Sequence, residues 1–143
     1  MSTPPLIPIR PAFDPNLHHQ TMTKPNSIER INVEHRFSDI AVFQNVAYLA
    51  GQVPRPDAGV DIRSQMTDVL DQIDGLLAGV GSDKTKILSC QIFIADIRDI
   101  AVMNEVWDAW VAPGNAPPRA TVQATLARPH YRVEVVMTAA IAG

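Results

Sequence analysis

The stretch from residue 62 to residue 80 most constrains how this chain folds, because its apolar residues recur at steps of three and four. That spacing places them on one side of an α-helix. Asp61 stands at the expected N-cap, and Gly79 and Gly81 mark the other end. Gly75 inside the helix costs roughly 1 kcal/mol relative to Ala, so we expect a close packing contact there. The apolar positions are Ile62, Met66, Val69, Leu70, Ile73, Leu76, Leu77 and Val80.

Residues on either side of this helix alternate in steps of two, which is typical of half-buried strands. Strands are expected at residues 28–33, 40–43, 46–50 and 87–95. Gln44 and Asn45 lie between the second and third of them and indicate a two-residue hairpin. In the 87–95 strand one face is expected to carry Leu88, Cys90, Ile92 and Ile94. A second, shorter helix is indicated by Met103, Val106, Trp107 and Trp110, before Pro113 and Gly114.

The last third of the chain is expected to form a β-hairpin with its turn near Pro129. Its core-facing residues are expected to be Ala120, Val122, Ala124 and Leu126, and then Val133, Val135, Met137, Ala139 and Ile141. The predicted fold is α+β, with both helices packed on one face of a mixed sheet. The other face is expected to carry Thr121, Gln123, Thr125, Val136, Thr138 and Ala140. Because that mixed face needs a cover, we expect an oligomer.

The length of 143 residues suits one domain, preceded by an extension. Six of the twelve prolines lie in residues 1–27, so this segment is expected to run extended. Two interpretations stay open, a loosely ordered tail and an arm that packs on a neighbouring subunit. The domain is expected to span residues 28–143.

Charge, apolar runs and residue spacing argue against several classes of partner and site. A formal net charge of −3 makes nucleic acid and anionic membranes poor candidates. No apolar run reaches transmembrane length and no signal peptide is visible, so the cytoplasm is the expected location. The single cysteine, Cys90, is expected to serve packing and not as a reactive thiol. The spacing of the four histidines and of the carboxylates matches no metal-site motif, so no metal is expected.

Arg119 and Glu134 are the two residues left with a chemical role to consider. A guanidinium at a strand start can bind a carboxylate in a bidentate manner, and a confined glutamate can activate a water. On the hairpin both residues were expected to project away from the helices. Each residue alone is better explained as a surface charge at a strand end, so these patterns do not decide the function.

Several short segments, in their order and spacing, resemble the RidA family (the YjgF-type proteins), and the resemblance covers residues 28–143. The segments are Tyr48–Pro54, Asp61–Gln65, Gly81–Ile87, Asn104–Trp107, Pro118–Val122 and Val133–Val135. The resemblance implies a homotrimer of chorismate-mutase-like subunits with clefts between them. It further implies hydrolysis of 2-imino and 2-enamino acids to 2-keto acids and ammonia, of the 2-iminobutanoate/2-iminopropanoate deaminase type, without metal or cofactor.

The resemblance also assigns site residues. The family arginine falls on Arg119 and the family glutamate on Glu134, as the catalytic pair. Gly51, Asn104 and Thr121 match substrate-binding positions in the cleft, and Phe37 stands at a further one. Two departures concern the family's upstream tyrosine, where Phe37 keeps the ring without the hydroxyl, and its second glutamate, where this chain has Val136.

The expected hairpin makes a geometric prediction. In its register Arg119 and Glu134 are offset by about five residues, roughly 17 Å at ~3.3 Å per residue. Both could then serve one small ligand only if they came from different subunits. The alternative function is a non-catalytic trimer that binds small carboxylate metabolites as a sensor, which the loss of the tyrosine hydroxyl at Phe37 favours. RNA cleavage or chaperone activity is a third alternative, and the acidic chain offers no basic groove for RNA.

Overall fold

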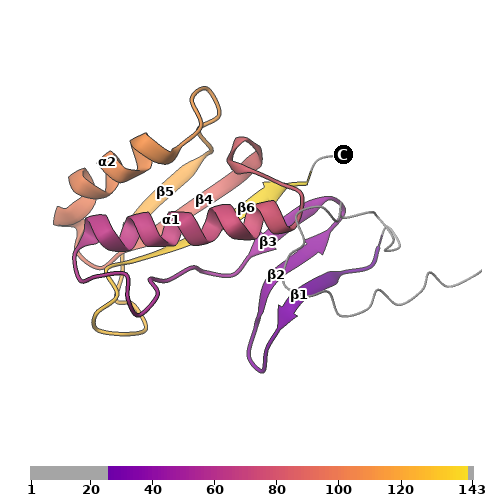
Figure 1. Ribbon diagram of the computed structural model, residues 1–143, viewed down its shortest axis with the longest axis horizontal. Helices are drawn as coiled ribbons and strands as arrows, with labels where there is room; N and C mark the ends of the chain where they lie inside the picture. The colour runs from indigo at the N-terminus through magenta and orange to yellow at the C-terminus, as the bar shows by residue number, and fades with distance from the viewer. Residues whose placement is uncertain (1–25, 142–143) are drawn as a thin grey trace, which may run out of the picture.

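The computed structural model describes residues 26–141, which form a six-stranded sheet with two helices on one side (Figure 1). The predicted extension, residues 1–27, lies almost wholly outside the described residues. The strands are β1 (Glu29–Val33), β2 (Ser38–Phe43), β3 (Val46–Leu49), β4 (Ile87–Ile94), β5 (Arg119–Gln123) and β6 (Val133–Ala140). The helices are α1 (Ile62–Gly79) and α2 (Ile100–Trp110), with short 3-10 turns at Lys84–Lys86 and Ile97–Asp99. The predicted α+β class is confirmed.

The strand order is β1-β2-β3-β6-β4-β5. Neighbours are antiparallel except β4 and β5, which run parallel. A parallel pair needs a crossover connection, and α2 provides it. The last strand, β6, therefore lies at the centre of the sheet between β3 and β4.

Local signals in the sequence determine the ends of several elements. The Asp61 side chain accepts a hydrogen bond from the Ser64 backbone N–H at 3.0 Å and caps α1 as predicted. Gln44 and Asn45 both have positive φ and connect β2 to β3, which confirms the two-residue hairpin. The predicted stripe of α1 packs on β6 and joins the buried residues of the sheet in the core, with Leu76 partly buried at its rim.

Three expectations about packing are wrong. Leu88 is 47% exposed, because a bulge between Ile87 and Ser89 turns it off the buried face of β4. A Cβ atom added at Gly75 would have no atom of the described part of the chain within 4 Å, so no close contact there explains that glycine. β5 and β6 do not form a hairpin, because β4 is inserted between them.

The inserted strand also reverses the faces of β5. Arg119 pairs with Cys90 and Thr121 with Ile92, and both partners are buried on the helix side. Arg119 and Thr121 therefore point toward the helices, opposite to the prediction, while Ala120 and Val122 lie on the open face. The expectation for β6 is confirmed, since Val133, Val135, Met137 and Ala139 are buried and the residues between them are partly exposed.

Candidate functional site

The Glu134 carboxylate lies against the backbone of Gly51. Glu134 is on the open face of β6, level with Phe93 of β4. Gly51 follows β3 and is held there because Gln52 and Val135 exchange two backbone hydrogen bonds, of 2.8 and 3.0 Å. A Cβ atom at position 51 would come within 2.1 Å of Glu134 Oε2. Only glycine therefore leaves room for the carboxylate in this position.

The Arg119 guanidinium lies over the indole of Trp107 on α2, with its Cζ 5.1 Å from the ring centroid. Arg119 is exposed at the start of the edge strand β5. Within residues 26–141 no carboxylate forms an ion pair with it. A cation held by a ring keeps all its N–H donors available, so this guanidinium can accept an external anion.

Thr121 and Asn104 follow Arg119 along the same seam between β5 and α2. Arg119 reaches Trp107, and Gln123 accepts a hydrogen bond of 2.8 Å from the Ile97 backbone N–H, so β5 and α2 run in opposite directions. Thr121 lies midway on the strand, and Asn104 lies one turn of α2 from Trp107. Thr121 Oγ1 and Asn104 Oδ1 are both buried and have no hydrogen-bond partner among residues 26–141. Such atoms are rare and need an explanation, which a bound polar ligand would provide.

The candidate residues thus fall into two groups. The seam group is Arg119, Thr121 and Asn104, and the carboxylate group is Glu134 and Gly51. Through β4, Arg119 is level with Cys90 and Glu134 with Phe93, three residues further along and on the opposite face. The offset is roughly 10 Å along the strands and about 10 Å across two strand spacings. The predicted separation was worked out from a hairpin of β5 and β6, which does not form. Within one subunit the two groups nevertheless lie apart.

Phe37 belongs to neither group by direct contact. It precedes β2 in the turn after β1, at the opposite edge of the sheet from Arg119, and its carbonyl accepts a hydrogen bond from the Glu34 N–H at 2.8 Å. Its ring is 54% exposed. Phe37 is thus available to a partner. In the strand order it lies, like Gly51, among β1, β2 and β3.

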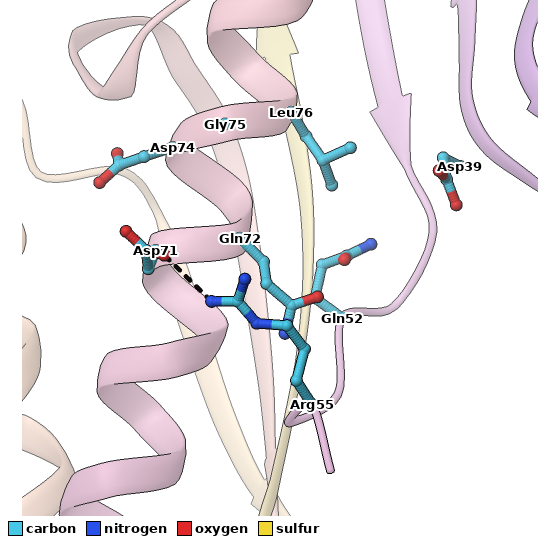
Figure 2. A pocket seen from close by; sticks show the side chains of 8 residues that line it. All are labelled: Asp39, Gln52, Arg55, Asp71, Gln72, Asp74, Gly75 and Leu76. Atoms are coloured by element: carbon cyan, nitrogen blue, oxygen red, sulfur yellow. Dashed lines mark hydrogen bonds and ion pairs between the residues drawn. The ribbon is translucent and has the colours of Figure 1, made fainter. Parts of the chain in front are cut away.

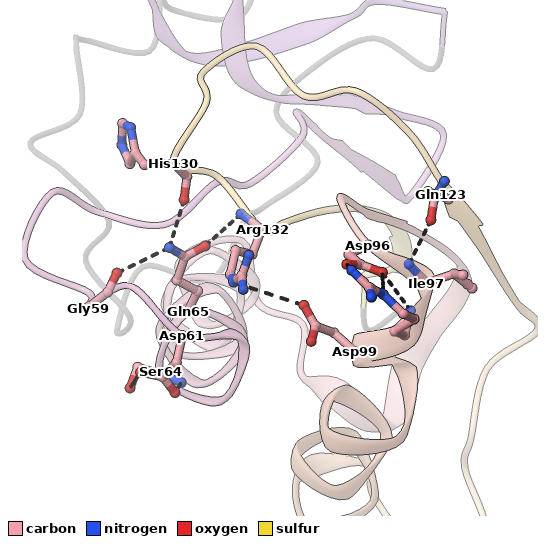
Figure 3. A network of polar contacts seen from close by, with 11 residues as sticks. Gly59, Asp61, Ser64, Gln65, Asp96, Ile97, Asp99, Gln123, His130 and Arg132 are labelled. Carbon is pink, nitrogen blue, oxygen red and sulfur yellow. Dashed lines mark hydrogen bonds and ion pairs between the residues drawn. The ribbon is translucent and has the colours of Figure 1, made fainter.

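Gln65 organises the loops that lead to the carboxylate group (Figure 3). Its side chain is 1% exposed and donates to the carbonyls of Gly59 and His130, at 3.1 and 3.0 Å. Its Oε1 accepts the Arg132 backbone N–H at 2.8 Å. The connection from β5 to β6 is thereby fixed just before Glu134. The residue patterns did not identify Gln65. The signal that could have found it is a glutamine next to Met66 on the apolar side of a helix, where a polar side chain needs buried hydrogen-bond partners.

A groove of about 670 Å³ lies between α1 and the segment after β3 (Figure 2). Arg55 spans its wall, with hydrogen bonds of 2.8 Å to Asp68 and 3.0 Å to Asp71. Gln72 donates to the Val53 carbonyl at 2.8 Å. No predicted site residue lines the groove. Its contacts hold the segment that carries Gly51 and Gln52 against α1.

A reactive thiol and a metal site are the other kinds of site that the sequence raised. Cys90 is buried, as predicted, and burial raises the pKa of its thiol to about 12 while the nearby Arg119 charge opposes that shift. In residues 26–141 no three His, Cys, Asp or Glu side chains gather as metal ligands would. None of the helices in that range has the length and apolar character needed to span a bilayer.

Comparison with known proteins identifies a family and several relatives. Residues 27–141 match the family described as Endoribonuclease L-PSP. A RutC family protein of Haemophilus ducreyi is 48% identical over 114 residues, covering 80% of this chain and 97% of that protein. The RutC family protein YoaB of Escherichia coli is 45% identical over 115 residues, covering 80% and 99%.

Solved structures agree with the sequence relatives. A YjgF family member from Neisseria meningitidis has a TM-score of 0.81 and 42% identity, covering 84% of this chain and 99% of that chain. YyfA of Yersinia pestis, from the conserved Rid family, has a TM-score of 0.71 and 28% identity, covering 76% and 90%. The family match begins at residue 27, so residues 1–26 lie outside it.

Proposed function

Because the chain belongs to the Endoribonuclease L-PSP family, which includes the RutC, YjgF and Rid proteins, we propose that it hydrolyses reactive 2-imino and 2-enamino acids. The products are 2-keto acids and ammonia, as in a 2-iminobutanoate/2-iminopropanoate deaminase. The proposal places this reaction in the cytoplasm and requires neither metal nor organic cofactor.

The reaction is the addition of water across a C=N bond. Arg119 binds the substrate carboxylate through two parallel hydrogen bonds and so places C2. Glu134 orients a water toward C2 and takes one of its protons as the new C–O bond forms. Glu134 then gives that proton to the carbinolamine nitrogen, the C–N bond breaks, and ammonia leaves as the C2 hydroxyl loses its own proton to water and becomes a carbonyl. Positioning and proton transfer are sufficient for so reactive a substrate.

The division of the candidate residues into two groups carries this proposal. Counting partners within residues 26–141, the seam group offers a guanidinium without a carboxylate and two unsatisfied polar atoms, while the carboxylate group offers an acid against a glycine backbone. They lie on opposite faces of one sheet, so each group needs the other from a second subunit. We therefore propose a homotrimer with the substrate bound between subunits. The exposed side chains of Tyr48, Leu88 and Val122 on sheet strands are consistent with a partner surface.

A trapping assay tests the activity. An amino-acid oxidase generates 2-iminobutanoate in situ, semicarbazide traps it, and an active deaminase lowers the yield of trapped product. We expect Arg119→Ala to abolish this effect and Arg63→Ala to retain it. Arg63 is a matched control because its ion pair with Glu105, at 3.4 Å, is exposed and contributes little. An unchanged yield with wild-type protein across several imines would contradict the proposal.

Mixing two inactive variants tests whether the site is shared. Arg119→Ala and Glu134→Ala subunits, unfolded together and refolded, should form mixed assemblies in which some clefts contain both native residues. Activity should then reappear, although each variant alone is inactive. If each site lay within one subunit, no mixture would regain activity.

The second candidate function is a non-catalytic binder of small carboxylates, which Phe37 favours because it lacks a hydroxyl donor. Wild-type protein that binds 2-oxobutanoate without accelerating imine hydrolysis would support it. The family description also names an endoribonuclease. RNA binding needs clustered cations, and the formal net charge here is −3, so the small-molecule reaction takes precedence.

A further inference from the structure

The orientation of Arg119 depends on one aromatic ring. An arginine side chain at an exposed strand end has many rotamers, and ordering it costs conformational entropy. Within residues 26–141 no carboxylate holds this guanidinium, and its contact is with the face of Trp107, 5.1 Å from the ring centroid. A carboxylate partner would order the guanidinium but would also occupy its donors. An indole face orders it and leaves the N–H edge free for a ligand.

Trp107 is itself held rigidly. It is only 5% exposed and packs against Trp110, with ring centroids 5.5 Å apart and planes inclined at 45°. The Trp110 indole N–H donates to Asp74 of α1 at 3.0 Å, and the Lys84 ammonium lies 5.2 Å from the Trp110 ring centroid. A continuous set of contacts therefore runs from α1 through both indoles to Arg119.

We propose that Trp107 is a positioning residue that orients the Arg119 guanidinium for the substrate carboxylate. This inference rests on the function proposed above, and it gives Trp107 an orienting role that neither Asn104 nor Thr121 provides. Trp107 acts through Arg119 and touches no reacting atom. Its loss should weaken carboxylate binding about three- to tenfold, the range of a partly desolvated cation–π contact.

Two substitutions separate positioning from packing. Trp107→Leu retains apolar bulk and removes the ring, whereas Trp107→Phe retains a smaller aromatic face. We expect Trp107→Leu to raise both the Kd for 2-oxobutanoate, measured by calorimetry, and the KM for the imine. The kcat should stay within about twofold, because the carboxylate contact is equally strong in ground and transition states. Trp107→Phe should recover most of the affinity.

Fluorescence gives a readout that a purely structural role would not affect. The chain has two tryptophans, so Trp110→Phe leaves Trp107 as the only one. In that variant, 2-oxobutanoate bound at Arg119 should change the Trp107 emission, and adding Arg119→Ala should remove the change. This test needs no substitution of Trp107 and so holds even if Trp107→Leu fails to fold.

The outcomes distinguish the inference from the proposed function. If wild-type protein binds no 2-oxobutanoate, the carboxylate anchor of the proposed function fails. If wild-type protein binds it and a folded Trp107→Leu variant binds it equally well, or the Trp107 emission does not respond, the positioning role is overturned. A selective loss of affinity in Trp107→Leu with recovery in Trp107→Phe supports it.

Discussion

Gly51→Ala should disable the proposed enzyme without unfolding it. The new Cβ would lie 2.1 Å from Glu134 Oε2, 3.0 Å from Cδ and 3.3 Å from Cγ. Ordinary contact begins near 3.4 Å, so the carboxylate has to move by more than about 1 Å. Gly51 does not have a positive φ, so alanine fits its backbone. Because the clashing atoms end a flexible side chain, the melting temperature should change little.

The expected effect on activity is large, because a displacement of this size at a reacting group costs on the order of 10²-fold. We expect kcat/KM for 2-iminobutanoate hydrolysis to fall by about that factor, with circular dichroism melts as the check on folding. The same substitution in a Glu134→Ala background should have almost no further effect, since the clash is gone. An equal loss in both backgrounds would refute the reasoning, because Gly51 would then act independently of Glu134.

Three further predictions concern stability. Gln65→Leu leaves two carbonyls and one N–H unpaired in a buried region. Urea unfolding should therefore show a free energy of unfolding lower by on the order of 3 kcal/mol. An unchanged free energy would exclude a structural role for the network. Gly75→Ala should raise the free energy of unfolding by about 1 kcal/mol, because its Cβ meets nothing; a decrease would reveal a close contact in the assembly. The pKa of Asp83 is lowered to about 2, chiefly by hydrogen bonds from Thr85. Its contribution should be present above about pH 4 and lost as the pH falls toward 2, so melting temperatures of wild type and Asp83→Ala should converge there.

Local patterns in the sequence predicted local structure well. The α1 stripe, the Asp61 cap and the Gln44–Asn45 turn depend on residues a few positions apart, and all three are confirmed. The order of strands is a tertiary property, and the segment from Gln123 to Val133 is long enough to pass over β4. Alternation in β5 showed which residues share a face but not which face is inside. That strand lies at the sheet edge, where burial of either set differs little.

For the candidate site, too, the sequence predicted part of the arrangement and the structure supplied the rest. Resemblance located Arg119 and Glu134, but only the structure placed them on opposite faces and showed the indole beneath the guanidinium. The spacing of Trp107 indicated only that it belongs to a second helix, and in the structure it is also a core residue. A buried ring that also holds a cation occupies the same helical positions as an ordinary core residue, so the spacing of apolar residues cannot distinguish the two roles.

The central place of β6 has a consequence for how the chain is made. During synthesis β6 emerges after all the other strands, yet it joins β1-β2-β3 to β4-β5. Until it arrives, the sheet exists as two fragments whose inner edges, on β3 and β4, are unpaired. Such edges invite pairing with other chains. The nascent sheet is therefore exposed to aggregation until β6 leaves the ribosome, and folding of the whole sheet has to be completed after translation of residues 133–140.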